Sequence, residues 1–485
     1  MLRSTDLFFV VLGFVVYTLI DIQSKQRDIL KKIQNQPENT QENVKNAPVA
    51  WVRGKKSSTD YLKHIKTVFK RVGYDVVEGE AEPQKWDVFW SHEYPFTTYK
   101  DVIQKVQPTQ LVNHIPGSSY YTFKVFLATA GLSKGIPKSF ALPQQSHDFK
   151  EYAKKNPKVQ WVQKSNAHRE IRILKTDQVE LSRADSFVQE YVSNPLLIDG
   201  KKFDLGIYTV VTSLSPLRVY IYENEILLRF CPKEYHPFDA NDLDKYVVAD
   251  DYTPIWEMPS FNNTYNTQTL SFKNSLAVYL ESQGKSINTI MDQIRSTIRE
   301  VFERLNQKMT SNLHSFENSE VFFELSRFDF LIDEDLNVYL MEANMSPNLS
   351  SQHFKPNALL YEQLLINMFS LLGISNTYKL AKEVKSDISL RQIEVPDRSL
   401  FINLPSCNQK CKDCPETVEM CQLCANCMPN SLKLHLENAY YEHLNRREMK
   451  RVAPSVEDAF SKLTKFDRLQ QIWFKNKCLE DKIYC

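Results

Sequence analysis

The segment from residue 323 to residue 351 constrains the fold of this chain more than any other part of the sequence. It reads FELSRFDFLIDEDLNVYLMEANMSPNLSS, which is two apolar runs separated by a polar turn at Asp333 to Asn337. If the first run returns through this turn as a β-hairpin, one allowed register sets Asp329 directly opposite Glu342. Residues two apart on a strand share a face. The side chains predicted to point the same way on the second strand are those of Val338, Leu340, Glu342 and Asn344.

Two facing carboxylates repel each other unless a cation or a proton lies between them. Oxygen ligands without His or Cys suit a hard ion, and Mg²⁺ takes one or two carboxylates together with phosphate oxygens. The carbonyl of Asn344 would complete such a set, so the hairpin predicts a Mg²⁺ site at Asp329, Glu342 and Asn344. The alternative is an edge hairpin whose acidic side chains face water, but both strands are otherwise apolar on both faces.

Helix-like and strand-like segments alternate from Trp51 to about Leu372, which predicts an α/β or α+β fold. With 485 residues, 42% of them hydrophobic, the chain can build two or three domains. Apolar residues spaced three and four apart from Ile287 to Leu305 predict an amphipathic helix. The runs predicted to be strands are Leu205 to Thr212, Leu217 to Tyr222, Glu225 to Phe230, Val321 to Leu325, Phe328 to Asp333 and Val338 to Ala343.

The N-terminus carries an uncharged apolar run, Leu7 to Ile20, with one basic residue before it and four soon after it. Because about 20 apolar residues cross a bilayer, this run is short enough for either a signal-peptide core or a compact anchor. No small-x-small cleavage site follows it, so we interpret residues 1–24 as a transmembrane signal anchor, with a buried N-terminal helix as the alternative. Residues 25–48 are rich in Gln, Asn, Lys and Glu and predict a polar stalk.

The charge balance argues against one class of partner. The chain has 60 basic and 59 acidic residues, which gives a net charge of +1. Proteins that bind nucleic acid carry a basic excess, so no nucleic-acid partner is predicted. Any recognition by charge must therefore be local.

The cysteines are concentrated at one end of the chain. Of nine cysteines, only Cys231 precedes residue 400, and the other eight lie between residues 407 and 485. An even set confined to residues 376–485 predicts disulfides in an oxidising compartment or zinc ligands in a reducing one. The apolar N-terminal run and the even number favour disulfides, with zinc as the alternative.

Four blocks of sequence, in order, resemble the tubulin tyrosine ligase-like family. They are the carboxylate hairpin described above, LVNHIPGSSYYTFK at 111–124, WVQKSNAHREIRIL at 161–174, and FVQEYV to ILLRF at 187–230. The resemblance covers roughly residues 86 to 372 and implies an ATP-grasp catalytic domain, placed at 151–375, after a smaller α/β domain at 49–150. It implies ATP and Mg²⁺ as cofactors and an amide bond made through an acyl phosphate. In this family the usual acceptor is tubulin, and the amino acid added is tyrosine, glutamate or glycine.

The resemblance also implies a role for each candidate residue. Lys124 and Lys164 would neutralise phosphate oxygens during catalysis, and Arg229 would stabilise the charge on the transferring phosphoryl group or bind a carboxylate. Gln189, Glu190, Tyr191 and Val192 would form the hinge that reads adenine, and Lys202 and Asp204 would hold the nucleoside. Asp329, Glu342 and Asn344 would hold the metal ion, with Asp329 also beside the nucleotide.

The chain departs from the family pattern at three places. No glycine follows Lys164 in SNAHREIRI. His168 and Arg169 would partly replace the lost positive charge, and the alternative is that they are ordinary loop residues. The family motif K-F-D-[LI]-R ends here in Gly206. Residues 244–254, DKYVVADDYTP, have no clear match to the H-x-T-N segment that contacts the amino acid, so that pocket is altered or absent.

We therefore predict an ATP-dependent carboxylate–amine ligase that adds glutamate to tubulin or microtubules. Glutamate is preferred because anchored members of this family are mostly glutamylases. Two alternatives remain: a non-catalytic protein that keeps nucleotide or tubulin binding, and a lumenal ligase with another substrate.

The predicted location is a single-pass protein of the endoplasmic reticulum or secretory membranes. The basic residues that follow the anchor favour a cytosolic body by the positive-inside rule. The cysteine pattern and the glycosylation triplets at Asn262 and Asn348 favour a lumenal body. Both orientations stay open at this point.

Overall fold

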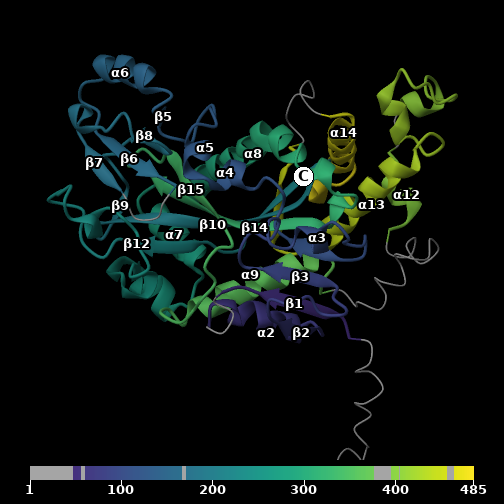
Figure 1. The fold of residues 1–485 in the computed structure, drawn as a ribbon, viewed down its shortest axis with the longest axis horizontal. Helices are drawn as coiled ribbons and strands as arrows, with labels where there is room; N and C mark the ends of the chain where they lie inside the picture. Colours follow the sequence, from purple (N-terminus) through teal and green to yellow (C-terminus); the bar gives the residue numbers. More distant parts are fainter. Residues whose placement is uncertain (1–46, 56–59, 167–170, 376–394, 403–404, 456–463) are drawn as a thin grey trace, which may run out of the picture. The chain divides into compact units, whose positions relative to one another are not determined.

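The computed structural model describes residues 47–55, 60–166, 171–375, 395–402, 405–455 and 464–485 (Figure 1). The predicted anchor at 1–24 and all but the end of the stalk lie outside these residues. Residues Val49 to Cys485 form one compact unit. Within the described ranges, no helix combines the length and the apolar character needed to cross a bilayer.

A mixed sheet of twelve strands forms the centre of this unit, in the order β13-β12-β10-β14-β4-β3-β1-β2 along its main path. Strands β11 and β9 pair with β10, β15 pairs with β14, and β16 pairs with β11. The strands are β1 (Val49–Arg53), β2 (Asp75–Glu78), β3 (Val88–Ser91), β4 (Leu111–Asn113), β9 (Leu197–Ile198), β10 (Lys201–Leu214), β11 (Leu217–Tyr222), β12 (Leu227–Phe230), β13 (Thr253–Pro254), β14 (Phe322–Ile332), β15 (Val338–Met345) and β16 (Met449–Ala453).

A second, smaller sheet has four strands in the order β5-β8-β6-β7. They are β5 (Ser139–Leu142), β6 (Trp161–Ser165), β7 (Arg172–Leu174) and β8 (Ser186–Glu190), and helix α6 (Ser146–Lys155) packs against β5. Its own apolar core includes Phe140, Phe149 and Trp161, with the ring centroids of Phe149 and Trp161 4.9 Å apart. The chain is thus an α/β protein with two sheets and separate cores.

Helices cover both faces of the main sheet. Helix α8 (Ile287–Thr310) packs on the face that contains Phe328, whose ring contacts Phe302 of this helix. The opposite face contains Tyr208, whose ring contacts Tyr361 of helix α9 (Asn357–Leu371). Besides α6, α8 and α9, the α-helices of the described chain are α2 (Lys63–Arg71), α3 (Lys100–Ile103), α4 (Ser119–Thr122), α5 (Lys124–Ala128), α7 (Phe272–Ser282), α12 (Asp397–Leu400), α13 (Asn430–Asn445) and α14 (Lys465–Glu480).

The predicted amphipathic helix is confirmed as α8, which begins at the predicted Ile287 and continues to Thr310. The hydroxyl of Ser286 accepts a hydrogen bond from the backbone N–H of Asn288 and so caps its first turn. One stripe of the helix is buried, and its members are Ile290, Met291, Ile294, Thr297, Ile298, Val301, Phe302, Leu305 and Met309. The spacing in the sequence therefore reported the buried face correctly.

Most predicted strands are confirmed, but one prediction was wrong. The runs at 321–325 and 328–333 were predicted as two strands, whereas they form the single strand β14. The gap between the two predicted runs falls at Ser326 and Arg327, yet both residues are buried in a strand that pairs with β10 on one side and β15 on the other. Polar side chains are tolerated in such a strand when they are paired on one face of it.

The predicted hairpin register is confirmed, because Asp329 pairs with Glu342 and residues 333–337 form the turn. The predicted faces of the second strand were wrong, because the register shifts between Asp329 and Phe330, and Phe330 pairs with Leu340. Met341 is therefore an extra residue, which is a β-bulge. It keeps Val338, Leu340 and Ala343 buried while Glu342 and Asn344 are partly exposed.

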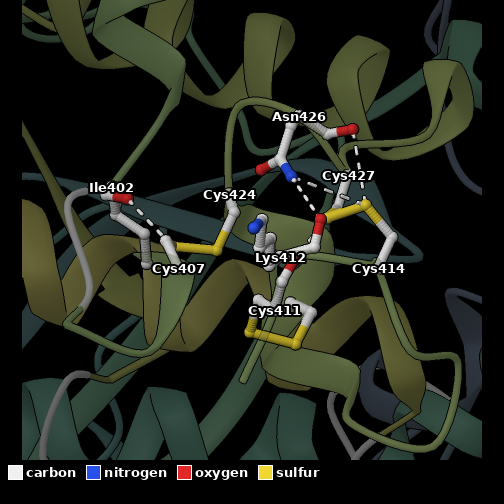
Figure 2. The surroundings of a disulfide bond; sticks show 9 residues. Ile402, Cys407, Cys411, Lys412, Cys414, Cys424, Asn426 and Cys427 are labelled. Carbon is white, nitrogen blue, oxygen red and sulfur yellow. Dashed lines mark hydrogen bonds between the residues drawn. A yellow bond between two sulfur atoms is a disulfide. The ribbon is translucent and has the colours of Figure 1, made fainter. Parts of the chain in front are cut away.

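The C-terminal tail joins the main sheet through β16, which pairs antiparallel with β11. Eight cysteines form four disulfides. One of them is Cys478–Cys485. The other three, Cys407–Cys424, Cys411–Cys421 and Cys414–Cys427, lie together (Figure 2). The side chain of Asn426 donates a hydrogen bond to the carbonyl of Lys412 beside them. Cys231 is free and buried. The cysteine pairing agrees with the favoured prediction of disulfides over zinc ligands.

The main sheet takes strands from all three of the segments predicted at 49–150, 151–375 and 376–485. Strand β4 pairs with β14, and β11 pairs with β16, so hydrogen bonds cross both predicted boundaries. The boundaries at 150 and 375 stay predictions, and the described segments pack as one unit.

Candidate active site

The predicted site residues come together on one face of four neighbouring strands, β12, β10, β14 and β15. Strand pairing sets Asp204 beside Arg229, Gly206 beside Asp329, and Asp329 beside Glu342. Cross-strand partners share a face, so the ladder alone places these polar side chains in one row. The same face contains Tyr208, which contacts α9, and the opposite face is packed against α8.

Asp329 is at the centre of this row, and it is 2% exposed. Its carboxylate accepts hydrogen bonds from Nε and Nη2 of Arg327, at 2.6 and 2.9 Å. The Nη2 group of Arg229 lies 3.0 Å from Oδ2, and the amide of Asn344 donates to the same oxygen at 3.1 Å. A carboxylate has about four acceptor positions. Four groups therefore contact this carboxylate, three of them at Oδ2 and one at Oδ1.

Glu342 lies closer to the surface, and its side chain is 29% exposed. Nζ of Lys124 lies 2.9 Å from Oε2, and the amide of Asn344 donates to Oε1 at 3.0 Å. Burial alone would raise the pKa of Glu342, but Lys124 and Asn344 together hold this pKa well below its ordinary value. Helix α5, which carries Lys124, packs against β15 and so brings this cation to the carboxylate.

Arg229 and Asp204 form a bidentate pair across β12 and β10, with N···O distances of 2.9 and 2.7 Å. Burial raises the pKa of Asp204 to about 6, although the charge of Arg229 opposes this change. Burial would lower the pKa of Arg229, but Asp204 and Asp329 raise it above its ordinary value. Arg229 is therefore a permanent cation held between two carboxylates.

Lys164 lies on β6 of the small sheet, and its Nζ donates to the side-chain oxygen of Gln189 at 3.0 Å. Burial, followed by the charge of Lys124, lowers the pKa of Lys164 to about 8. Its charge also interacts with Glu342 and Lys202. Lys164 of the small sheet and Lys202 of the main sheet thus both contribute positive charge to the site.

The predicted adenine hinge lies at the end of β8, where Val192 is partly buried. The backbone N–H groups of Glu190 and Tyr191 donate to the carbonyls of Lys138 and Gln160. These two donors are therefore committed to the fold. Adenine recognition by this hinge would fall to the backbone of Val192 or to carbonyl groups.

The side chains of the hinge are also held in place. The carboxylate of Glu190 accepts a hydrogen bond from the hydroxyl of Tyr152 at 2.8 Å, and the hydroxyls of Tyr191 and Tyr235 lie 2.9 Å apart. The amide of Gln189 donates to Ser139 at 3.0 Å. These contacts make the hinge a pre-formed element.

Lys202 connects this region to the segment 244–254, which the sequence left without a match. Its Nζ donates to the carbonyl of Tyr246 at 3.0 Å and lies 5.5 Å from the ring centroid of Tyr191. Burial lowers the pKa of Lys202. In the same segment, the hydroxyl of Tyr252 accepts a hydrogen bond from Asn357 of α9. The segment therefore contacts the predicted site residue Lys202 and packs against α9.

Arg327 was not among the predicted site residues, although it forms the closest contacts with Asp329. It precedes Asp329 by two residues on β14, so strand alternation places both side chains on one face. That signal was present in the sequence. Because the sequence was divided into two predicted strands, Arg327 fell between them and was not assigned to the face of Asp329.

The residues present fit a hard cation by donor type. Asp329 and Glu342 offer carboxylate oxygens on adjacent strands, as Mg²⁺ requires when phosphate oxygens complete its shell. Among the described residues, no cluster of three or more His, Cys, Asp or Glu side chains is arranged to hold a metal by itself. A metal at this place would therefore depend on ligands from outside the protein, and it would displace one of the cationic groups now at the carboxylates.

Comparisons with known proteins find a matching family model and several similar proteins. The model of the tubulin-tyrosine ligase family matches residues 103–381. The chain is 50% identical over 447 residues to the protein named probable tubulin polyglutamylase ttll-15 of Caenorhabditis elegans, across 90% of this chain and 87% of that protein.

More distant relatives share the central part. The human tubulin polyglutamylase TTLL6 is 26% identical across 70% of this chain and 36% of its own length. The mouse tubulin polyglutamylase TTLL5 is 28% identical across 61% of this chain and 23% of its own length. This chain thus spans less than half of these two relatives.

Proposed function

Because the chain belongs to the tubulin-tyrosine ligase family, we propose that it is an ATP-grasp ligase that joins glutamate to tubulin. In this reaction ATP phosphorylates a carboxylate, and the amine of the second substrate then displaces phosphate to form an amide. The observation that carries the proposal is the row of Asp329, Glu342 and Asn344 on adjacent strands, next to a cluster of cationic side chains. The names of the relatives supply the amino acid and the acceptor.

The cationic side chains give the site its chemical capacity. Lys124, Lys164 and Arg229 surround the carboxylates, and positive charge fixed in a partly buried site stabilises phosphoryl oxygens more than charge in water does. Asp329, Glu342 and Asn344 would hold Mg²⁺, which supplies charge neutralisation between phosphate groups. The low pKa of Glu342 keeps it ionised and ready to accept a cation at neutral pH.

Glutamate transfer is tested with the purified full chain, tubulin, labelled glutamate, ATP and Mg²⁺. We expect label on tubulin that depends on ATP, and at least about a 100-fold loss in Asp329→Asn or Glu342→Gln. The control is Asp335→Asn, which changes an exposed carboxylate in the turn of the same hairpin. If ATP binds and no label is incorporated by the wild-type chain, the protein is a binding protein and the proposal is wrong.

A second candidate, a lumenal ligase with a different protein substrate, is favoured by the four disulfides of the tail. Disulfides persist in oxidising compartments and are rare in the cytosol. The side chains of Asn262 and Asn348 are exposed, so both glycosylation triplets are accessible. We propose accordingly that the chain is anchored in the endoplasmic reticulum or secretory membranes.

The two candidates differ in the side of the membrane on which the body lies. If it is lumenal, glycosidase treatment of the full-length protein from cells increases its mobility in gel electrophoresis. Asn262→Gln with Asn348→Gln then removes this change. Mobility that glycosidase leaves unaltered, together with label on tubulin, supports the cytosolic ligase instead.

A further inference from the structure

Gly206 occupies the middle of β10, where its backbone conformation does not require glycine. A Cβ atom at this position would lie 2.9 Å from Cδ of Arg327 and 3.1 Å from Cβ of Leu227. Glycine weakens the interior of a strand, and it often marks a place where another group approaches closely. Here the approaching group is the side chain of Arg327.

Arg327 pairs with Tyr208 across β14 and β10, and its side chain extends over Gly206 towards Asp329. It is 8% exposed, so its charge is almost entirely removed from water. Within the described part of the chain, both of its hydrogen bonds go to Asp329, from Nε and Nη2. A guanidinium has five N–H donors. Three donors are therefore left for a further acceptor.

The charges around Arg327 also favour an additional anion. Five cationic side chains share this region with three carboxylates, which leaves an excess of two positive charges when the lysines are protonated. The cations are Lys124, Lys164, Lys202, Arg229 and Arg327, and the carboxylates are Asp204, Asp329 and Glu342. Buried charge without a counter-ion is costly, so such an excess suits a bound anionic group.

We propose that Arg327 is an anion-binding residue of the active site, which holds Asp329 with two N–H groups and presents the others to substrate oxygens. Its ligand is an oxyanion, either the terminal phosphoryl group of ATP or the carboxylate of the amino acid. A guanidinium binds both by the same paired geometry. The inference rests on the proposed function and adds a residue to its site.

This arrangement changes the meaning of Gly206. The sequence motif around Gly206 suggested that a cationic group was missing from β10. Arg327 carries its guanidinium from β14 across position 206, where a Cβ atom would lie 2.9 Å from its Cδ and force one of the two side chains to move. The two positions are therefore coupled, and an arginine can be carried by one strand or the other but not by both.

A reciprocal exchange tests this coupling in the full chain. The variants are Arg327→Gln, Arg327→Lys, Gly206→Arg, and the double variant Gly206→Arg with Arg327→Gly. We expect Arg327→Gln to lower glutamate incorporation about 100-fold, with little recovery in Arg327→Lys. Gly206→Arg alone should also lose activity because it collides with Arg327. The double variant should regain at least tenfold over either Arg327→Gln or Gly206→Arg.

Binding measurements separate the two possible ligands and do not depend on turnover. Calorimetric titration with ATP and with ADP, each with Mg²⁺, shows whether Arg327→Gln loses affinity for ATP more than for ADP. Such a loss assigns the phosphoryl group, whereas weaker binding of glutamate in the same kind of titration, with unchanged ATP affinity, assigns the amino acid. Thermal melting of each variant identifies any that fail to fold, and Arg304→Gln, an exposed arginine on α8, is the control.

The proposal is overturned if Arg327→Gln folds and retains wild-type ATP and glutamate binding, or if the double variant is no better than the single variants. If the wild-type chain binds ATP and transfers no glutamate, the ligase function fails, and the calorimetric comparison still decides the role of Arg327. A wild-type chain that binds neither nucleotide contradicts both.

Discussion

Lys164 illustrates how burial sets the properties of one side chain in this site. Burial and the nearby charge of Lys124 lower its pKa to about 8, whereas a lysine in the unfolded chain titrates near 10.5. Burial of the charged form therefore opposes folding below about pH 8, and this effect is relieved as the pH rises from 8 to 10.5. A phosphate group needs the charged form, so anion binding follows the opposite trend.

We predict that ATP affinity of the wild-type chain falls as the pH rises above about 8, approaching tenfold for each pH unit. In Lys164→Arg the charge persists at all these pH values, so its affinity should stay nearly constant between pH 7 and 9.5. Lys164→Met should bind weakly throughout. Calorimetric titrations at several pH values measure this, and the same decline in Lys164→Arg as in wild type would show that another group titrates.

The hairpin of β14 and β15 positions the site, and its turn depends on Asp333. This residue is 3% exposed, and its carboxylate accepts hydrogen bonds from the backbone N–H groups of Asp335 and Asn337. It also accepts from the side chains of Asn337 and Tyr339. The turn is therefore organised around one buried carboxylate.

We predict that Asp333→Ala lowers the free energy of unfolding by about 3 kcal/mol, because four hydrogen bonds to one buried carboxylate are lost at once. It should also weaken ATP binding, since the turn fixes the register of Asp329 against Glu342. Urea denaturation measures the first effect. The matched control is Asp335→Ala, an exposed residue two positions further on, which should change stability by less than about 0.5 kcal/mol.

At the scale of the whole molecule, the C-terminal tail is part of the catalytic unit. Glu442 of α13 is 7% exposed and accepts hydrogen bonds from Thr212, Arg218 and Tyr220, on β10 and β11. Arg218 is also buried, so this ion pair lies inside the packed unit. Strand β16 adds backbone hydrogen bonds to the same edge of the sheet.

We predict that Glu442→Ala lowers the free energy of unfolding by about 3–5 kcal/mol, because it leaves the buried charge of Arg218 without its carboxylate partner. Nucleotide binding and the folded state should be lost together, since β10 carries Asp204 of the site. Lys450→Ala, an exposed residue on β16, is the control. Thermal melting with and without ATP measures both effects, and a tail that unfolds separately from the site would contradict the prediction.

The sequence by itself determined the helix α8, most of the strands of the sheet and the register of Asp329 opposite Glu342. These features follow from local spacing, because the period of apolar residues reports which face of an element is buried. A short turn leaves few ways to pair two strands. The residues proposed to hold Mg²⁺ could therefore be identified from one hairpin, and the order of the four blocks identified the family.

Only the tertiary structure decided the bulge at Met341, the pairing of the cysteines, the docking of β16 on β11 and the place of Arg327 over Gly206. Each depends on a contact between residues that neighbouring sequence does not specify. Arg327 and Gly206 are 121 positions apart, and neither shows in isolation that one fills the space left by the other. Local patterns record which side of a strand is buried, whereas packing decides which atoms meet there.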